Sequence, residues 1–388
     1  MTSVPSDQHE RAYFTSLLLV LNPRAGTGFF AHFIPEIEAY LRACHPDLDI
    51  EVVHSTGPGE ITKLIQQRLD RCRDQQEEHD LLVAVAGGDG SLHQAIQALS
   101  GRQAALMAIP VGSGNDFARH IYSALHFGHR LGSKRAFRAA LERFGFLPKS
   151  TTRKTMVGEE RQANRKPQHT ALQGVLTRQE VDLIAMTSAS AWWTFDPREK
   201  RRTACQAYAL NALSLGWDSL VAMRANRFAR RFFSLGRFNY ILAAVPELFG
   251  SMRYAFCWRH KGEETWQNEV YTLGLLGNAP YYGGGFQPNP QASIADGRLE
   301  LTLSQSLSPW RMLRHVIGLR QATPQTQQIF RRNALQTEIE IQATKEQRQT
   351  LCCTLDGEGL VAEQLSLQIC PKALRLALPY DLPNLDQI

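Results

Sequence analysis

The chain has 388 residues, 43% of them hydrophobic and 21% charged, which excludes a disordered chain and is typical of a globular protein long enough for two domains. Its net charge of +6 is compatible with an anionic partner but does not distinguish nucleotide, lipid headgroup and nucleic acid. Seven cysteines without C-x-x-C spacing indicate reduced thiols. No apolar run reaches the roughly 18 residues of a membrane span and no signal peptide is visible, so we expect a cytoplasmic protein whose membrane contacts are peripheral.

The first part of the chain repeats one pattern four times: an apolar strand, a loop rich in Gly, Ser, Thr or Asn, and a helix. This alternation predicts an α/β domain with a doubly wound parallel sheet and all four loops along one edge. Together the loops favour a site for nucleotide phosphates, because helix N-termini and exposed backbone N–H groups bind anions. The predicted strands cover 14–21, 50–54, 81–86 and 106–110, and helices are predicted over 31–41, 61–71 and 92–99.

The third loop carries the most informative residue. Gly87, Gly88 and Gly90 allow positive φ and leave no Cβ to block a ligand that approaches the backbone. Among them is Asp89, a carboxylate at the place where phosphate would bind. Because like charges repel, Asp89 suits this place only if it works through Mg²⁺, takes up a proton or orients a donor, which favours phosphoryl transfer. The alternative is a plain Asp-Gly turn between a strand and a helix.

The first loop gives a weaker signal. Asn22 and Thr27 follow the first strand and either hydrogen-bond a nucleotide or cap a turn. The sequence G-x-x-x-x-G-K-[ST] is absent, so the chain does not contain a P-loop.

A polar, basic stretch over 149–173 follows and is predicted to be a linker or insertion. The chain then alternates strands with few helices, which predicts a largely antiparallel β-sandwich domain. We therefore expect an α/β nucleotide-binding domain over 11–148, to which the segment 373–388 returns, and a β-rich substrate domain over 174–372. The strands predicted in it cover 181–186, 204–214, 252–258, 270–277, 298–303, 337–341, 351–355 and 365–369, and a helical stretch covers 219–249.

Arginines alternate with phenylalanines over 224–240. This suits the surface of an anionic bilayer, but a core helix with inward aromatics and solvated arginines explains the pattern as well. The cations are not gathered around aromatics that could stack on bases, so we expect no nucleic-acid partner.

Two Asp-Gly pairs in the second part carry further chemistry. Asp296 either forms a hairpin turn or supplies a carboxylate, with nearby backbone carbonyls, to a hard cation. Asp356 and Glu358 follow an apolar strand, where a turn is the ordinary interpretation. Paired acids near a phosphate-binding edge are also what the activation of an alcohol by a general base needs.

In their order along the chain, these motifs resemble the diacylglycerol kinase catalytic family, which includes bacterial soluble diacylglycerol kinases, YegS-like lipid kinases and sphingosine kinases. The resemblance extends from residue 17 to about 378. Its most specific parts are the Gly87-Gly88-Asp89-Gly90 loop and the segment GSGNDFAR over 112–119. Asn22-Pro23, the glycines at 283–285 with Asp296-Gly297, and Asp356-Gly357-Glu358 support it. Ser91 and Ser113 stand where the family usually has Thr, and Ala25 replaces a common Ser.

The resemblance implies ATP bound in a cleft between the domains, with transfer of its γ-phosphoryl to the hydroxyl of a lipid alcohol such as diacylglycerol. Glu358, beside Asp356, would be the proton acceptor, and Asp89 would manage Mg²⁺ and the phosphates. A structural Mg²⁺ loop would use Ser293, Asp296 and Arg298. The implied nucleotide contacts are Asn22, Pro23, Arg24, Ala25, Gly26, Thr56, Gly87, Gly88, Asp89, Gly90, Ser91, Leu92, His93, Gln94, Ser113 and Asn115.

We therefore expect a lipid kinase whose partners are ATP, a lipid alcohol and the surface of an anionic membrane, with Asp89 or Glu358 taking the alcohol proton. Two alternatives stay open: a small-molecule kinase of the NAD kinase type, which also carries a GGDG loop, and a non-catalytic lipid-binding or regulatory protein on the same scaffold. The sequence does not name the lipid, and it leaves the oligomeric state open, a homodimer included.

Overall fold

Four parallel strands form the first half of the protein, seen here in a computed structural model. Their order is β4–β3–β1–β2, and β1, β3 and β4 are buried along their whole length, as near-continuous apolar strands of parallel sheets are. The predicted α/β architecture is confirmed. The elements of this half are β1 (Ser16–Leu21), η1 (Phe29–Phe33), α1 (Ile34–Cys44), β2 (Asp49–His54), α2 (Glu60–Leu69), α3 (Gln75–His79), β3 (Leu81–Gly87), α4 (Asp89–Leu99), β4 (Ala105–Pro110) and α5 (Asp116–Ile121).

The structure describes residues 11–25, 29–112, 114–122, 138, 141–148, 176–194, 203–231, 238–250, 252–335, 337–344, 350–380, 382 and 385. The predicted linker over 149–173 lies outside these residues, as do Gly26, Thr27 and Ser113. Within the described part of the chain, no helix combines the length and the apolar character needed to span a bilayer.

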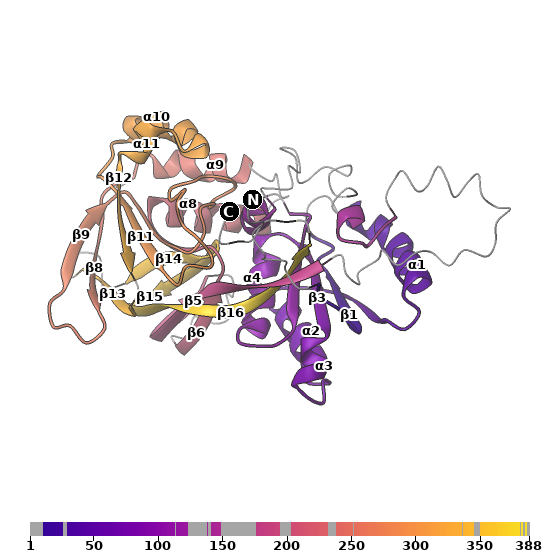
Figure 1. Cartoon of the computed structure of the whole chain (residues 1–388). Coiled ribbons are helices and arrows are strands. Elements are labelled where there is room, and N and C mark those ends of the chain that lie inside the picture. The colour runs from indigo at the N-terminus through magenta and orange to yellow at the C-terminus, as the bar shows by residue number, and fades with distance from the viewer. Residues whose placement is uncertain are drawn as a thin grey trace, which may run out of the picture.

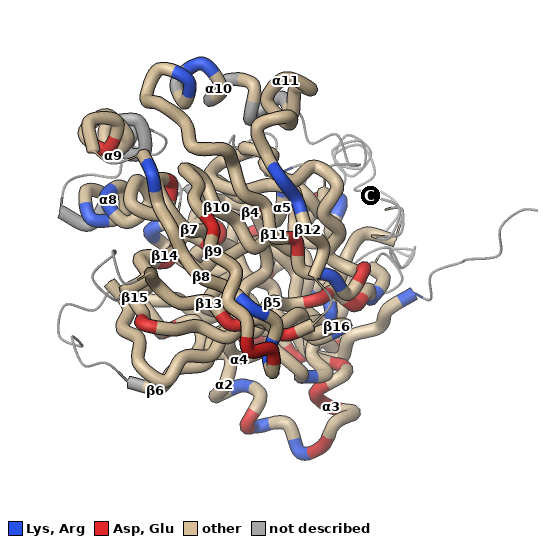
Figure 2. The backbone as a smooth tube through the Cα atoms, turned by 90° about the vertical axis from the view of Figure 1, so that its left-hand side faces the viewer, with Lys and Arg blue, Asp and Glu red and all other residues tan. Residues whose placement is uncertain are grey.

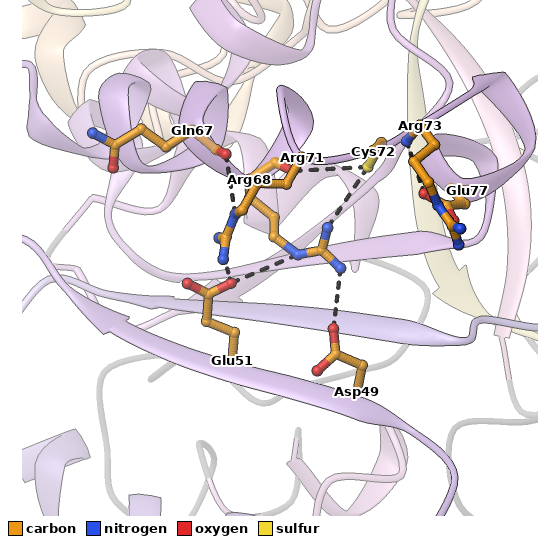
Figure 3. Close-up of polar contacts among 8 residues, drawn as sticks. All are labelled: Asp49, Glu51, Gln67, Arg68, Arg71, Cys72, Arg73 and Glu77. Atoms are coloured by element: carbon orange, nitrogen blue, oxygen red, sulfur yellow. Dashed lines mark hydrogen bonds and ion pairs between the residues drawn. The ribbon is translucent and has the colours of Figure 1, made fainter.

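Ion pairs attach α2 to the edge strand β2 (Figure 3). Arg68 lies 3.3 Å from Asp49 and 3.6 Å from Glu51, and Arg71 lies 2.6 Å from the same Glu51 carboxylate. Ile61 and Ile65, two turns and one turn before Arg68 on the same side of α2, are buried in the core. This contact fixes the helix that follows the second predicted loop.

The second half is mainly antiparallel and β-rich, as predicted. The structure divides two predicted strands, because the 204–214 segment turns at residues 210 and 211 and the 270–277 segment is interrupted at residue 272. Sequence reasoning also missed β12 and β15. The elements are β5 (Leu176–Trp193), β6 (Thr203–Ala209), β7 (Ala212–Gly216), α8 (Trp217–Arg231), α9 (Phe238–Glu247), β8 (Tyr254–His260), β9 (Gln267–Tyr271), β10 (Leu273–Gly277), β11 (Leu299–Ser304), α10 (Pro309–Gln321), α11 (Pro324–Gln327), β12 (Phe330–Leu335), β13 (Ile339–Ala343), β14 (Leu351–Leu355), β15 (Glu358–Ala362) and β16 (Gln364–Pro379).

Two long strands, β5 and β16, connect the two halves into one sheet (Figure 1). They pair antiparallel with each other, with an irregularity between Cys370 and Leu374. Beyond it, Arg375 and Leu376 of β16 also pair parallel with Ala105 and Leu106 of β4. The end of β16 therefore belongs to the sheet of the first half, and its apolar side chains join the core of that half.

Candidate active site

The loops after β3 and β4 approach each other through their glycines. The positive φ expected at Gly87, Gly88 and Gly90 is not found, and Gly88 has a φ of −106°. The glycines are needed for space instead: a Cβ on Gly88 would lie 3.1 Å from the Cα of Gly112, and one on Gly112 would overlap the Cα of Gly88. Of the two properties of glycine named from the sequence, positive φ is not used here, and the lack of a Cβ is what allows the two loops to pack closely.

Asp89 is the first residue of α4, which begins three residues before the predicted helix at 92–99. A negatively charged residue in the first turn of a helix interacts favourably with the helix dipole. The Asp89 side chain extends toward α5, where Oδ1 accepts a hydrogen bond of 3.3 Å from the backbone N–H of Phe117. Oδ2 lies so near Gly114 that a Cβ there would be 2.7 Å from it.

The electrostatic environment of Asp89 opposes its ionisation. Burial, together with repulsion from Asp116 and more weakly from Asp356, raises the pKa of Asp89 to about 7, although the N–H groups of Phe117 and Asp116 act in the opposite direction. Asp116 itself accepts a 2.7 Å hydrogen bond from the backbone N–H of Gly284, in the second half of the chain. Asp89 is therefore a carboxyl group that changes its charge near neutral pH.

Glu358 places a second carboxylate at the start of α4. It is the first residue of β15, and its Oε1 would be 3.2 Å from a Cβ on Gly90. Gly90 directly follows Asp89, so an acid from the first half and an acid from the second half lie against one short backbone segment.

Asp356 lies in the two-residue turn between β14 and β15. Asp356 and Gly357 have φ values of +48° and +87°, the combination that a tight hairpin needs. The carboxylate of Asp356 accepts hydrogen bonds of 2.8, 2.9 and 3.1 Å from three backbone N–H groups, and His93 Nδ1 lies 3.5 Å from it. Its carboxylate thus joins the hairpin to the turn between β6 and β7, whose donors are Leu210, Asn211 and Ala212.

The residues after β1 border the same loop. Asn22 donates a 2.9 Å hydrogen bond from Nδ2 to the hydroxyl of Ser91, and its Oδ1 accepts one of 3.0 Å from the N–H of Arg24. The backbone N–H of Ala25 donates to the carbonyl of Asn22, which closes a turn around Pro23. The loop after β1 is thereby connected to α4, on which Asp89 lies.

The remaining implied nucleotide contacts are more dispersed. The hydroxyl of Thr56 donates to Glu60 at 2.7 Å, and the same carboxylate accepts from the N–H of Gly57. Leu92 is buried in the core of the first half. The carbonyl of Gln94 accepts from Thr62. His93 and Asn115 are both buried; the His93 ring packs against Trp193, and Asn115, at φ +53°, donates to the carbonyl of Gly112.

The predicted metal loop contains hydrogen bonds between its own neighbouring residues. Asp296 Oδ1 accepts from the N–H of Arg298 at 3.0 Å, and the N–H of Ala295 is 3.4 Å from the hydroxyl of Ser293. Burial raises the pKa of Asp296, and repulsion from Asp182 adds to this. A cation would relieve that repulsion, so the donors fit a hard cation held by one carboxylate and backbone carbonyls. In the described ranges there is no group of three or more His, Cys, Asp or Glu side chains able to hold a metal.

Asp218, at the start of α8, is another buried carboxyl group, and sequence reasoning missed it. Burial raises its pKa to about 7. Nearby, the hydroxyl of Tyr282 donates to Ser214 at 2.7 Å, and Ser214 is 2.6 Å from the hydroxyl of Thr354. Asp116 was also missed as an acid of the site, although the Asn-Asp pair of the segment at 112–119 could have indicated it.

The fold defines a two-domain protein in which an α/β domain with a parallel sheet is joined to an antiparallel β-rich domain. Residues 16–143 match the diacylglycerol kinase catalytic domain, and residues 211–378 match the YegS C-terminal NAD kinase beta sandwich-like domain. The chain belongs to the diacylglycerol kinase and YegS-like family that these two domains define.

Individual relatives agree with this placement. A diacylglycerol kinase of Mycobacterium tuberculosis is 28% identical over 234 residues, which are 60% of this chain and 57% of that protein, so the match spans little more than half of the relative. A YegS-like lipid kinase of Stenotrophomonas maltophilia is 23% identical over 345 residues, 87% of this chain and 89% of the relative. The structure of a diacylglycerol kinase from Bacillus anthracis shares the fold, with a TM-score of 0.54, 16% identity and coverage of 94% and 97%.

Proposed function

We propose that this protein is an ATP-dependent lipid kinase that transfers the γ-phosphoryl group of ATP to the hydroxyl of a lipid alcohol, diacylglycerol or a similar lipid. The observation that carries the proposal is that Glu358, from the second half, lies against Gly90, the residue after Asp89 at the start of α4. Family membership supports the reaction class, and the fold supports a nucleotide in the half over 11–148 and an acceptor in the half over 174–372.

The reaction needs positioning, stabilisation of charge and removal of one proton. The oxygen of the lipid hydroxyl forms a bond to the γ-phosphorus, the bond from that phosphorus to the bridging oxygen breaks, and ADP leaves. The hydroxyl proton goes to a carboxylate of the enzyme. Asp89 is our first choice, because a pKa of about 7 is matched to a general base near neutral pH. Glu358, the acceptor implied by the family resemblance, is the second.

Backbone geometry supports a phosphate site beside these acids. The glycines of the loops after β3 and β4 keep side chains away from the N-terminus of α4, where backbone N–H groups favour an anion. Asn22 and Ser91 would hold the border of this site through their mutual hydrogen bond. Asp356 is a positioning residue in this proposal, since its carboxylate is occupied by three backbone donors of the β6–β7 turn.

If Glu358 takes the proton, Asp89 fits a Mg²⁺ ion that arrives with the nucleotide, because one carboxylate plus substrate phosphates is a common ligand set for this ion. The two roles of Asp89 exclude each other, since a bound cation would lower its pKa. When bound, Mg²⁺ would neutralise phosphate charge and so lower the repulsion between ATP and the acids of the site. The loop of Ser293, Asp296 and Arg298 would hold a second, structural ion. We also propose that the protein is cytoplasmic and contacts the membrane peripherally.

The test is incubation of the full chain with labelled ATP, Mg²⁺ and a panel of detergent-dispersed lipid alcohols, followed by identification of the product. A phosphorylated lipid is expected, and the panel includes diacylglycerol, a sphingoid base, a polyprenol and phosphatidylglycerol. Phosphorylation of NAD without that of any lipid would favour the small-molecule kinase. No ATP turnover with a total lipid extract would favour a non-catalytic protein.

A further inference from the structure

Large apolar side chains are exposed together on the helical layer of the second half. Within the described ranges six large hydrophobic residues are exposed, and four of them lie on α9, on the turn after it and on the first turn of α10. Phe249 and Trp310 are 88% and 81% exposed, and Leu242 and Val245 are 54% and 50% exposed. Exposed apolar residues that are concentrated in one region usually mark an interaction site, whereas single scattered ones do not.

Three of these residues share one face of a helix. Leu242, Val245 and Phe249 follow each other at intervals of three and four residues, so they lie on one face of α9 and its continuation. The opposite face buries Ala243 in a cluster with Val221 of α8 and Met312 of α10. The inner faces of the three helices thus pack into one cluster, and α9 and α10 both lie at the same end of the second half (Figure 1).

The charge of this layer is concentrated and of one sign. The helices α8, α9, α10 and α11 contain seven arginines, no lysine and two acidic residues. One of the two acids, Glu247, is paired with Arg224 at 2.6 Å. Arg311 and Arg314, which follow Trp310 on α10, are exposed. Figure 2 shows blue segments of Lys or Arg on α10.

We infer that the outer side of α9 and α10 binds the surface of an anionic lipid bilayer. We call this the α9–α10 face and define it by Leu242, Val245, Phe249, Trp310, Arg311 and Arg314. Aromatic and aliphatic side chains flanked by arginines match the boundary between headgroups and acyl chains. A surface of one charge sign is complementary to anionic lipid, whereas a second copy would bring arginines against arginines. The inference rests on the proposed function, because a kinase of lipid alcohols must reach its acceptor in a membrane.

The experiment is sedimentation of the full chain with two kinds of vesicle, phosphatidylcholine alone and phosphatidylcholine mixed with phosphatidylglycerol. Binding to the anionic vesicles is expected, and it should weaken as salt is added. The double variant F249S/W310S should lower the partition coefficient at least about tenfold, because each buried aromatic contributes substantially. R311Q/R314Q should lose most of the preference for anionic vesicles.

Val270→Ser is the matched control, since Val270 is also 50% exposed but lies on β9, outside the α9–α10 face. It should bind vesicles as the wild type does. Wild-type binding by F249S/W310S would overturn the inference, and so would a wild-type dimer in light scattering that F249S/W310S converts to a monomer. Lipid kinase activity in detergent without vesicle binding overturns only this inference. Vesicle binding without kinase activity overturns only the proposed function.

Discussion

Gly88 and Gly112 pack backbone against backbone, with room for a Cβ on neither. A Cβ on Gly112 would overlap the Cα of Gly88 and also reach 2.8 Å from the side-chain oxygen of Asn115. The two glycines belong to loops after neighbouring strands, β3 and β4, so their contact sets the distance between the N-termini of α4 and α5. Asp89 extends from one of these helices to the other across that distance.

Replacement of Gly112 by Ala should therefore damage both stability and activity. Backbone atoms must move to admit the methyl group, and overpacking of this kind lowers the free energy of unfolding by about 1–3 kcal/mol. Urea denaturation measures the change. Gly57→Ala is the control, because a Cβ on Gly57 meets nothing within 4 Å, and its effect should stay within about 0.5 kcal/mol. Equal effects of the two substitutions would contradict the packing role.

Replacement of Asp89 by Asn should lower kcat at least about 100-fold, because an amide cannot take up the alcohol proton. The amide oxygen can still accept from the N–H of Phe117, so the fold should be retained. In the wild type, kcat/KM should rise with pH up to about 7, the pKa to which burial and Asp116 raise the Asp89 carboxyl, since only the deprotonated form is a base. Initial rates across this pH range with a detergent-dispersed acceptor test both expectations.

Glu358→Gln distinguishes the two candidate bases. If Asp89 takes the proton, this variant is slower than the wild type but keeps the rise in kcat/KM toward pH 7. If the rise disappears in Glu358→Gln and persists in Asp89→Asn, Glu358 is the proton acceptor. Glu264→Gln, a change at an exposed acid between β8 and β9, should behave as the wild type.

Asp356→Ala should lower the free energy of unfolding by roughly 3 kcal/mol. It removes the acceptor of three backbone N–H groups, and unsatisfied buried donors cost about 1–3 kcal/mol each before relaxation. Asp356→Asn should recover much of this stability, because Asn tolerates the left-handed conformation and keeps one acceptor oxygen. Thermal unfolding of the two variants gives the comparison. Identical destabilisation by both would show that the charge, and not the acceptor geometry, holds the turn.

Asp218→Asn should stabilise the protein above pH 7. Burial raises the folded-state pKa of Asp218 from 3.8 to about 7, so the folded state holds this proton more tightly than the unfolded state. The stability of the wild type should therefore decline between these two pH values and stay level above them. Denaturant unfolding at several pH values should show the advantage of the variant growing across this range. An advantage independent of pH would mean that Asp218 is charged throughout.

The sequence was sufficient for the parallel half because each buried strand is a continuous apolar run that ends at or just before a glycine, a proline or the pair Asn22-Pro23. β3 and β4 agree with their predictions to within one residue at each end. The antiparallel half was harder to predict. The turn that divides β6 from β7 is held by Asp356, 146 residues after Leu210, and nothing near Leu210 marks it.

In the candidate site, too, only the features formed by residues adjacent in sequence could be predicted. The motif around Asp89 was visible because strand, glycines and helix are adjacent in sequence. Its contacts with Phe117 and the approach of Glu358 to Gly90 depend on packing between distant segments. The close packing of Gly88 with Gly112 could likewise not be predicted. A glycine in a sequence does not reveal whether the fold needs its backbone conformation or its lack of a Cβ.

The pairing of β16 has a consequence for folding during synthesis on the ribosome. β16 follows in sequence every strand that it joins, and its last residues lie beside β4, which is synthesised long before it. Until β16 emerges, the nascent first half holds an open sheet edge at β4, of the kind that recruits chaperones or aggregates. Premature termination before Arg375 should therefore harm the distant N-terminal half as much as the half in which the chain was cut.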